Sequence, residues 1–443
     1  MANIFNFSKN VYQNLKQEYS KHTSLLFVFV ALLCIPLSYA SNSMSLALLT
    51  LITILNFKKE NLKFDINLIL PIVLYILMFL SLTWTIDFER TTNALSKELP
   101  LLIIPICFLL FRSFTTLEKD KIIKCYSYGI VVYSIFYLIK ALFRFIISND
   151  SSVFFYHELV TKDVNAIHVS VYIAISFFYF LVKTQKTTFD KLALGILFMM
   201  VFLLSSKNII VVFVGLLVIY QLFYTKTSKK LRLKNLILLI MILLFLPFVG
   251  KIKERFKEEY ETIMTDSSVN DVISKDSGTV YNVSIKQAWT NTAFKPNDYF
   301  PGTAFRVYQF RIFVELLQEE SIFWTGFGLD ASYSKIAEKG VHYNLFLGNE
   351  TQEGYQTKNF HNQYVQIFAE LGIFGFLLLL TMLLLSIRNA IKSKNFIHIA
   401  FSALIISLFI TESFLWRQRG VTFFILMYCI FNSNLKSEKT ISL

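Results

Sequence analysis

Apolar runs of about twenty residues recur along the chain, and this repetition constrains the fold more than any other feature. A helix of that length crosses the hydrocarbon core of a bilayer. Helices also satisfy their own backbone groups where no water is available. The chain has 443 residues, 55% of them hydrophobic, with only 7 prolines. The sequence therefore predicts an all-α, polytopic membrane protein.

We predict twelve spans. They lie near residues 23–40, 43–57, 67–85, 99–114, 122–148, 166–183, 190–206, 208–224, 234–250, 363–387, 396–413 and 420–433. The seventh and eighth are short for full crossings and are predicted to form a tight hairpin that turns at residues 205–207. The apolar stretch after residues 1–22 lacks a clear small-residue cleavage site, so the first span is predicted to be retained.

Lysine and arginine in the short loops set the predicted orientation. They concentrate in alternate loops, such as 58–63, 226–234 and 388–394, which we place in the cytoplasm with both termini. The long segment 251–362 then faces outward. It holds 12 Lys and Arg against 15 Asp and Glu, whereas the whole chain has a net charge of +13. Because the cations lie in loops between spans, the charge does not indicate a nucleic-acid partner.

Three parts follow from this layout. They are transmembrane helices one to nine (1–250), a large extracytoplasmic (periplasmic) loop domain between spans nine and ten (251–362), and helices ten to twelve with a cytoplasmic tail (363–443). Residues 251–260 are predicted to continue the ninth span as a charged helix, and residues 265–300 to be irregular.

The stretch from Phe360 to Phe376, FHNQYVQIFAELGIFGF, joins the outward segment to the tenth span. Its histidine, His361, should lie where a soluble domain meets the bilayer. An imidazole can accept a proton near neutral pH as a general base. A lone histidine at the membrane edge can equally be a hydrogen-bonded residue without a catalytic role. His361 falls nearly opposite the polar stripe that follows, so we predict that it precedes the regular helix.

That stripe consists of Gln363, Gln366 and Glu370 at helical spacing. A carboxylate at the depth of Glu370 needs a partner or water, so it should face the bundle interior. It would line a polar cavity or make a structural hydrogen bond between helices. Gly372 and Gly375 are predicted to allow close helix packing.

Cations outside the spans are candidate phosphate ligands, because guanidinium groups match phosphate oxygens. Arg306 and Arg311 lie on a predicted helix, 306–323, although most surface arginines are only solvated. The apolar face of that helix is predicted to hold Phe310, Phe313, Val314 and Leu317. Lys207 is a lone cation at the outer turn of the hairpin, where it would anchor the helix at the interface or contact a phosphate.

Other candidates lie in the outward turns and loops. Gly326 and Gly328 in TGFGLDAS would expose backbone N–H groups to an anion or form a plain turn. Glu412 and Arg417 in ESFLWRQRG would pair or line the same cavity, and His168 opens the sixth span from outside. No HExxH spacing is present, and the cysteines lack metal-ligand spacing, so no catalytic metal is predicted.

Together these motifs resemble the O-antigen ligase family, a group that also holds O-antigen polymerases and protein O-oligosaccharyltransferases. HNQYVQIFAELGIFGF resembles its signature, a His-Asn pair leading a helix with an Ala-Glu-x-Gly element. The matching positions are His361, Asn362, Tyr364, Ala369, Glu370, Gly372 and Gly375. RVYQF with the later TGFG resembles the family's Arg-x-x-x-aromatic helix ending in a Gly-x-Gly turn, on Arg306, Phe310, Gly326 and Gly328.

Two further elements are similar to the family. SSK at 205–207 resembles its Ser-Arg element with Lys207 in place of arginine, and ESFLWRQRGVTFF resembles a C-terminal element of some members. Lysine loses the bidentate geometry of arginine. The spacing from Arg306 to the glycine turn at 326–328 is slightly longer than the family pattern, so Arg311 competes with Arg306 for the role of the family's arginine.

The resemblance implies a GT-C-like glycosyltransferase in the bacterial inner membrane, with its active site facing the periplasm and no metal or cofactor. The donor would be a glycan on undecaprenyl pyrophosphate, and the acceptor a sugar hydroxyl of the lipid A core or another glycan. The implied roles are general base for His361 and pyrophosphate binding for Arg306, Arg311 and Lys207. Supporting positions are Asn362, Tyr364, Glu370, Gly326, Gly328, Glu412, Arg417 and His168.

Two other functions fit the same sequence. A polymerase on this scaffold would use another lipid-linked repeat as the acceptor, and nothing in the motifs separates it from a ligase. A transporter of the lipid-linked glycan would carry internal repeats and paired broken helices, for which the chain offers no matching halves.

Overall fold

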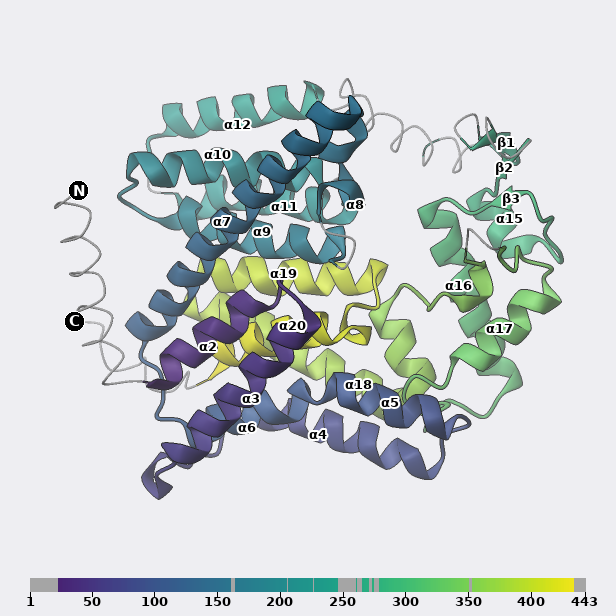
Figure 1. Cartoon of the computed structure of the whole chain (residues 1–443), viewed down its shortest axis with the longest axis horizontal. Helices are drawn as coiled ribbons and strands as arrows, with labels where there is room; N and C mark the ends of the chain where they lie inside the picture. Colours follow the sequence, from purple (N-terminus) through teal and green to yellow (C-terminus); the bar gives the residue numbers. More distant parts are fainter. Residues whose placement is uncertain are drawn as a thin grey trace.

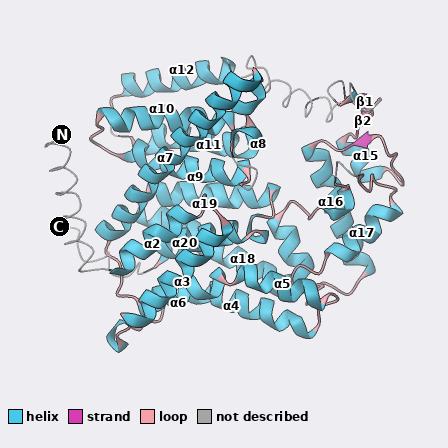
Figure 2. Cartoon of the chain, in the orientation of Figure 1, coloured by secondary structure: helices cyan, strands magenta, loops and turns pink. Residues whose placement is uncertain are grey.

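The computed structural model describes residues 23–160, 164–204, 206–225, 227–245, 260, 265–270, 273–274, 279–349 and 353–433. These residues are mostly helical (Figure 2). The charged helix predicted at 251–260 lies outside them except for its last residue. The predictions concerning residues 1–22 also lie outside the described residues.

The first half of the chain forms a helical bundle. Its helices are α2 (Thr23–Cys34), α3 (Tyr39–Leu55), α4 (Ile66–Leu80), α5 (Phe88–Glu98), α6 (Pro100–Leu110), α7 (Thr116–Ser148), α8 (Tyr156–Leu159), α9 (Ala166–Val182), α10 (Thr188–Leu203), α11 (Lys207–Ile219) and α12 (Lys229–Phe245). A π-helical turn, η4 (Tyr220–Tyr224), extends α11. The predicted hairpin is present as α10 and α11.

The second half contains a small domain and three more bundle helices. The small domain has α15 (Ile285–Thr290), α16 (Gly302–Glu319) and α17 (Tyr333–His342), and the bundle is completed by α18 (Gln363–Ser393), α19 (Phe396–Thr411) and α20 (Gln418–Asn432). Three strands, β1 (Ser268–Val269), β2 (Tyr281–Asn282) and β3 (Asp298–Tyr299), form a sheet in this order. The β1–β2 pair is antiparallel and the β2–β3 pair parallel. The prediction that 265–300 is irregular is therefore wrong for these short elements.

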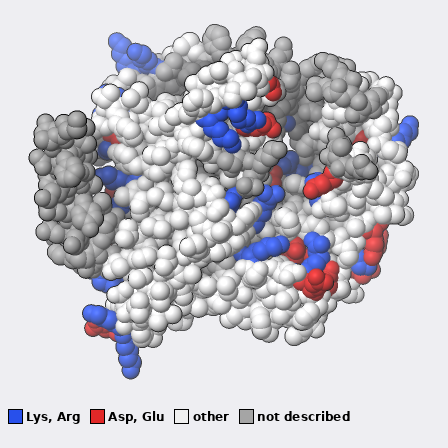
Figure 3. Space-filling model, in the orientation of Figure 1, with Lys and Arg blue, Asp and Glu red and all other residues white. Residues whose placement is uncertain are grey.

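Within the residues that the structure describes, five helical stretches are long and apolar enough to cross a membrane. By length and composition they are Ile66–Thr83, Phe88–Leu110, Thr116–Ser148, Lys207–Tyr224 and Gln363–Ser393. Helices overlap all twelve predicted ranges, but the count of twelve spans stays a prediction. Over the bundle, the face shown in Figure 3 carries few charged side chains, as expected for a surface against lipid.

The small domain lies at one end of the bundle helices (Figure 1). It has a hydrophobic core of its own, to which α18 contributes Val365 and Ala369. The predicted apolar face of its α16 is partly wrong, because Phe310 is 47% exposed. The face that packs against the core is formed by Phe305, Tyr308, Gln309, Ile312, Phe313 and Leu316. Aromatic residues occur on several sides of α16, so an error of one residue in the helix phase leaves a similar apolar pattern.

Helix α18 is interrupted at Gly372, whose φ of 63° and ψ of −162° are not helical. The turn that contains Gly326 and Gly328 docks into this break. Phe327 N–H donates to the carbonyl of Ala369 and Gly328 N–H to that of Glu370, each at 2.9 Å. A Cβ atom at position 372 would lie 2.2 Å from the Trp324 carbonyl oxygen. Glycine is required because the two backbones touch and φ is positive.

This docking decides between the two alternatives for the glycine-rich turn. Gly326 N–H donates to Ile322 and Gly328 N–H to Glu370, so neither points to an anion. The turn instead fixes the small domain against the start of α18. Gly372 is needed for this contact with the turn rather than for packing of a continuous helix.

Candidate functional site

A cavity of about 1540 Å³ lies where the small domain meets the bundle. The start of α11, the first turns of α16, the segment before α18 and the end of α19 all contribute to its wall. Six of the residues singled out from the sequence line it, namely Lys207, Arg306, His361, Asn362, Glu412 and Arg417. They come from four separate segments of the chain. In Figure 3, basic and acidic side chains gather along this junction.

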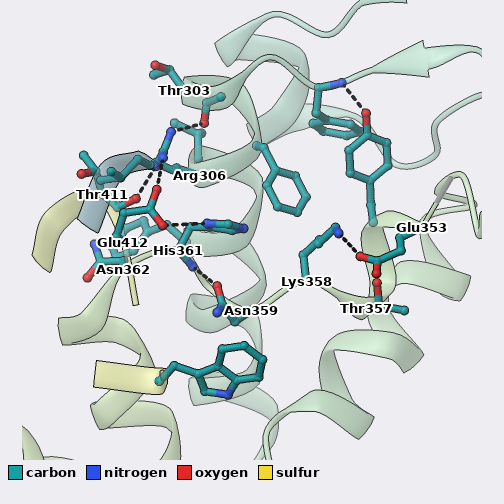
Figure 4. Close-up of a pocket in the computed structure, with 18 of the residues that line it drawn as sticks. Thr303, Arg306, Glu353, Thr357, Lys358, Asn359, His361, Asn362, Thr411 and Glu412 are labelled. Carbon is teal, nitrogen blue, oxygen red and sulfur yellow. Dashed lines mark hydrogen bonds and ion pairs between the residues drawn. The ribbon is translucent and has the colours of Figure 1, made fainter. Parts of the chain in front are cut away.

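His361 immediately precedes the helix, as predicted, and Asn362 is the N-cap of α18. The backbone of His361 is left-handed, with φ of 48°, a conformation that is uncommon outside glycine and clusters at functional sites. Its N–H donates to the Asn359 side chain at 3.0 Å, which holds this turn. The imidazole is 30% exposed, and its Nδ1 lies 3.6 Å from Oε2 of Glu412. The ring extends from Glu412 toward the middle of the cavity (Figure 4).

Glu412 is fixed on its other side by Arg306. The guanidinium donates to Oε1 of Glu412 at 2.9 Å, to the Thr411 carbonyl at 2.8 Å and to the Gly302 carbonyl at 2.9 Å. The Glu412 carboxylate thus lies between a guanidinium and an imidazole, and a neighbouring cation favours the ionised form of a carboxyl group.

The start of α11 adds positive potential to the same wall. Ser206, Lys207 and Asn208 line the cavity, and the Ser206 side chain makes no capping hydrogen bond. The first N–H groups of a helix and its dipole favour an anion. Asn208 donates to the Ser407 carbonyl and to Oγ1 of Thr411, both at 2.8 Å. Thr411 directly precedes Glu412, so these contacts attach the start of α11 to the segment that carries Glu412.

Arg311 is not brought to the cavity. It donates to Oε1 of Glu315 at 2.9 Å, to the Asn291 carbonyl at 2.7 Å and to the Tyr343 hydroxyl at 2.8 Å. Lys339 donates to the other oxygen of Glu315 at 2.9 Å. These residues form an ion-pair network inside the small domain, away from His361.

The polar stripe of α18 is buried, as predicted. Oε1 of Gln366 accepts from the N–H of Phe360 and the hydroxyl of Ser413, each at 3.3 Å. Oε1 of Gln363 accepts from the N–H of Leu415 at 2.8 Å. Gln366 thus ties the backbone of Phe360, next to His361, to the side chain of Ser413, next to Glu412.

Glu370 and Tyr364 lie behind the main cavity. Glu370 accepts a hydrogen bond from Gln366 and borders a second cavity of about 20 Å³, which Glu98 and Asp330 also line. Tyr364 donates to the Ile406 carbonyl at 3.0 Å, joining α18 to α19. Glu370 thus lines a small cavity, and its side-chain hydrogen bond with Gln366 lies within α18 rather than between helices.

His168 is buried and does not line the main cavity. Its ring packs on Phe414 with centroids 4.3 Å apart. It supports the segment 412–417 from the bundle side. Within the residues that the structure describes, no three His, Cys, Asp or Glu side chains are arranged to hold a metal ion.

Several residues of the site were not found from the sequence. Asn208 and Thr411 act through hydrogen bonds between distant segments, and Asn359 through a hydrogen bond to His361; no local motif marks them. Lys358 and Glu353 form an ion pair on the side of the cavity opposite Arg306 (Figure 4). Asn208, Asn359 and Thr411 lie within two residues of Lys207, His361 and Glu412 respectively, and this proximity is the signal that the sequence offers.

The comparisons with known proteins agree with the motifs. A family model described as O-antigen ligase matches residues 192–380. The chain carries an O-antigen ligase family domain. The match includes Lys207, Arg306 and His361, whereas Glu412 lies beyond its end. A comparison with curated proteins gave no significant match.

The family implies O-antigen ligase- or polymerase-type activity, a membrane glycosyltransferase-like enzyme, and a lipid-linked glycan with an acceptor as partners. The apolar helices agree with a membrane protein.

Proposed function

We propose that the protein transfers a glycan from undecaprenyl pyrophosphate to a sugar hydroxyl of the lipid A core, with His361 as general base. The observation that carries the proposal is the His361–Glu412 contact in a cavity whose wall also holds cations. These are Lys207, Arg306 and Arg417, with Lys358 on the side opposite Arg306. A base beside a cationic pocket is what transfer from a diphosphate requires.

Glu412 is assigned as a positioning residue. With Nδ1–H directed at its carboxylate, the imidazole keeps the Nε2 lone pair for the acceptor hydroxyl. The acceptor oxygen attacks the anomeric carbon as Nε2 takes its proton. The bond from that carbon to the phosphate oxygen breaks with its electron pair on the pyrophosphate, and the configuration inverts. A positioned base contributes roughly 10²–10⁴-fold to such a step.

The pyrophosphate is assigned to the wall formed by Arg306, Lys207, Arg417 and the start of α11. Negative charge that grows on the leaving group is met by cations already held in place. We therefore propose a step in which these side chains supply the positive charge that a metal would otherwise provide. Arg306 is preferred over Arg311 because it alone of the two lines the cavity.

The orientation predicted from the loop charges would turn this cavity toward the periplasm, with the chain in the bacterial inner membrane. A polyprenyl donor would then remain in the outer leaflet while its diphosphate enters the cavity. A polymerase would use the same base and the same cations with a lipid-linked repeat as acceptor. Products separate the two, since a ligase yields capped lipopolysaccharide and a polymerase yields longer lipid-linked chains.

The test is H361A, purified in nanodiscs with lipid-linked donor and core acceptor. We expect transfer at least about 100-fold slower than wild type with the fold retained. H342A is the matched control, because His342 is an exposed histidine of the same small domain that does not line the cavity. Full transfer by folded H361A would refute the assignment. Absence of donor turnover by the wild type, with the lipid-linked glycan only moved across the bilayer, would favour the transporter.

A further inference from the structure

Trp416 lies on the short helix η7 (Phe414–Trp416), four residues after Glu412. It is half-buried, and it lines the main cavity as well as the small one behind it. The indole thus forms part of the partition between the two. Other aromatic side chains, such as Phe305 and Tyr355, line the same cavity, and Trp416 is distinguished by the polar contacts that fix its ring.

The indole is held by a buried carboxylate. Its Nε1–H donates to Oδ1 of Asp330 at 2.6 Å, and Asp330 is only 4% exposed. Arg90 reaches the other carboxylate oxygen at 3.8 Å and donates to the Asp330 carbonyl at 3.3 Å. Burying a carboxylate is unfavourable unless it is paired and hydrogen-bonded. Here the paired carboxylate fixes the plane of one ring.

Cations and a second ring support the indole further. Lys97 lies over the Trp416 ring at 5.1 Å from its centroid, within the range of a cation–π contact. The Tyr333 ring is 5.9 Å away and tilted by 38°, and Arg90 lies over Tyr333 at 4.3 Å. Arg90 and Lys97 both belong to α5. Helix α5 thereby supports the cavity wall, although its residues lie between two of the predicted spans.

Other side chains that line the same cavity are suited to bind hydroxyl groups. Thr357, Asn359 and Glu353 line the same cavity on the side of the small domain (Figure 4). A pyranose ring has a face of C–H groups and a rim of hydroxyls. A rigid aromatic surface would take the face while amide, hydroxyl and carboxylate groups take the rim.

We propose that Trp416, with Tyr333 beside it, is a stacking platform for a sugar ring of one of the two glycans. This inference rests on the proposed function and names a subsite for it. The sugar belongs either to the donor glycan or to the acceptor. Sugar rings of the donor and of the acceptor have the same chemistry, so the KM of each substrate must show which of them stacks on the indole.

The experiment compares W416A, W416F and wild type in nanodiscs, with donor and acceptor concentrations varied separately. W324A is the matched control, because Trp324 is 62% exposed and does not line the cavity. We expect W416A to raise the KM of one substrate about 10-fold with kcat changed less than about 3-fold, since stacking binds ground state and transition state alike. The substrate whose KM rises identifies the source of the sugar.

W416F keeps a ring but loses the N–H that Asp330 accepts, so it should recover most of the lost affinity. Unchanged KM values for both substrates in W416A would overturn the inference while leaving transfer by His361 intact. So would a W416F variant as impaired as W416A, because the hydrogen bond rather than the ring would then matter. If the wild type transfers nothing, the proposed function fails, and the inference fails with it.

Discussion

Arg306 and Arg311 lie five residues apart on α16, and the structure gives them different surroundings. Five residues correspond to a rotation of roughly 140° around a helix. Arg306 faces the bundle and holds Glu412 in the main cavity, whereas Arg311 faces Glu315 and Tyr343 within the small domain. The same side chain can thus hold a reaction centre or a domain core, and sequence spacing alone does not separate the two.

The largest effect expected from this comparison is that of R306A. It removes a cation from the wall of the cavity and one partner of Glu412. Loss of a group that meets charge in the transition state reduces the rate by roughly 10²–10³-fold, and we expect kcat/KM for transfer to fall by that amount. R306K should recover only part of the rate, because lysine keeps the charge without the fork. A folded R306A protein with normal transfer would contradict the assignment.

The next largest effect is expected for E412Q, which tests whether Glu412 positions His361. The amide keeps the size of the side chain but loses the negative charge that faces Nδ1 of His361. We expect kcat to fall roughly 10- to 100-fold with the donor KM changed little, since binding energy is not the main loss. A loss in the double variant E412Q/H361A no larger than that in H361A alone would show that the two residues act as one unit. Independent, multiplicative losses would argue against the pairing.

R311A is expected to affect folding rather than transfer. It removes one of the donors to Glu315 and the hydrogen bond to the Asn291 carbonyl, and should reduce stability by about 1–3 kcal/mol. Transfer by the folded fraction should stay within a factor of about 3 of the wild type. Thermal unfolding and transfer rates of R306A and R311A, measured on the same preparations, check this. A loss of transfer in R311A as large as in R306A would remove the distinction between the two arginines.

The smallest expected effect is on the pH dependence of folding stability, to which Glu315 contributes. Burial raises the pKa of Glu315, but hydrogen bonds from Lys339, Tyr343 and Arg311 lower this pKa more, and the net lies below the ordinary 4.5. A depressed carboxyl pKa stabilises the fold at pH values above 4.5, and this contribution is lost as the pH falls through the folded-state value. E315Q should therefore be less stable than wild type at pH 7, by about 1 kcal/mol.

The stability difference between wild type and E315Q should shrink below pH 4.5. Thermal unfolding of both proteins at pH 7 and pH 4 measures it. A difference that stays constant between the two pH values would show that the network contributes through packing rather than through charge.

The sequence predicts the elements whose signals are local. Apolar length indicated the bundle helices, and the phase of Gln363, Gln366 and Glu370 placed them inside and His361 before the helix. The face of α16 was misassigned because aromatic residues occur on several of its sides. The docking of the Gly326 turn into the break at Gly372 joins backbones 46 residues apart, and the pattern of each segment alone gives no sign of it.

The residues of the main cavity were likewise predicted only where a local signal marks them. His361, Arg306 and Lys207 stood out because a motif or an unusual charge marks them. The contact between Glu412 and His361 depends on the end of α19 reaching the start of α18, which spacing does not determine. Trp416, Asp330, Arg90 and Lys97 come together from three distant segments. Their chemistry appears only once the fold has placed them.

The most direct test of the central claim is a structure of the wild-type protein with undecaprenyl pyrophosphate in a lipid nanodisc. The account predicts the diphosphate in the main cavity, within hydrogen-bond distance of Arg306 and close to Lys207 and the start of α11. Its terminal phosphate should face the imidazole of His361. A diphosphate bound beside Arg311, or held elsewhere with that imidazole turned away from it, would contradict the account.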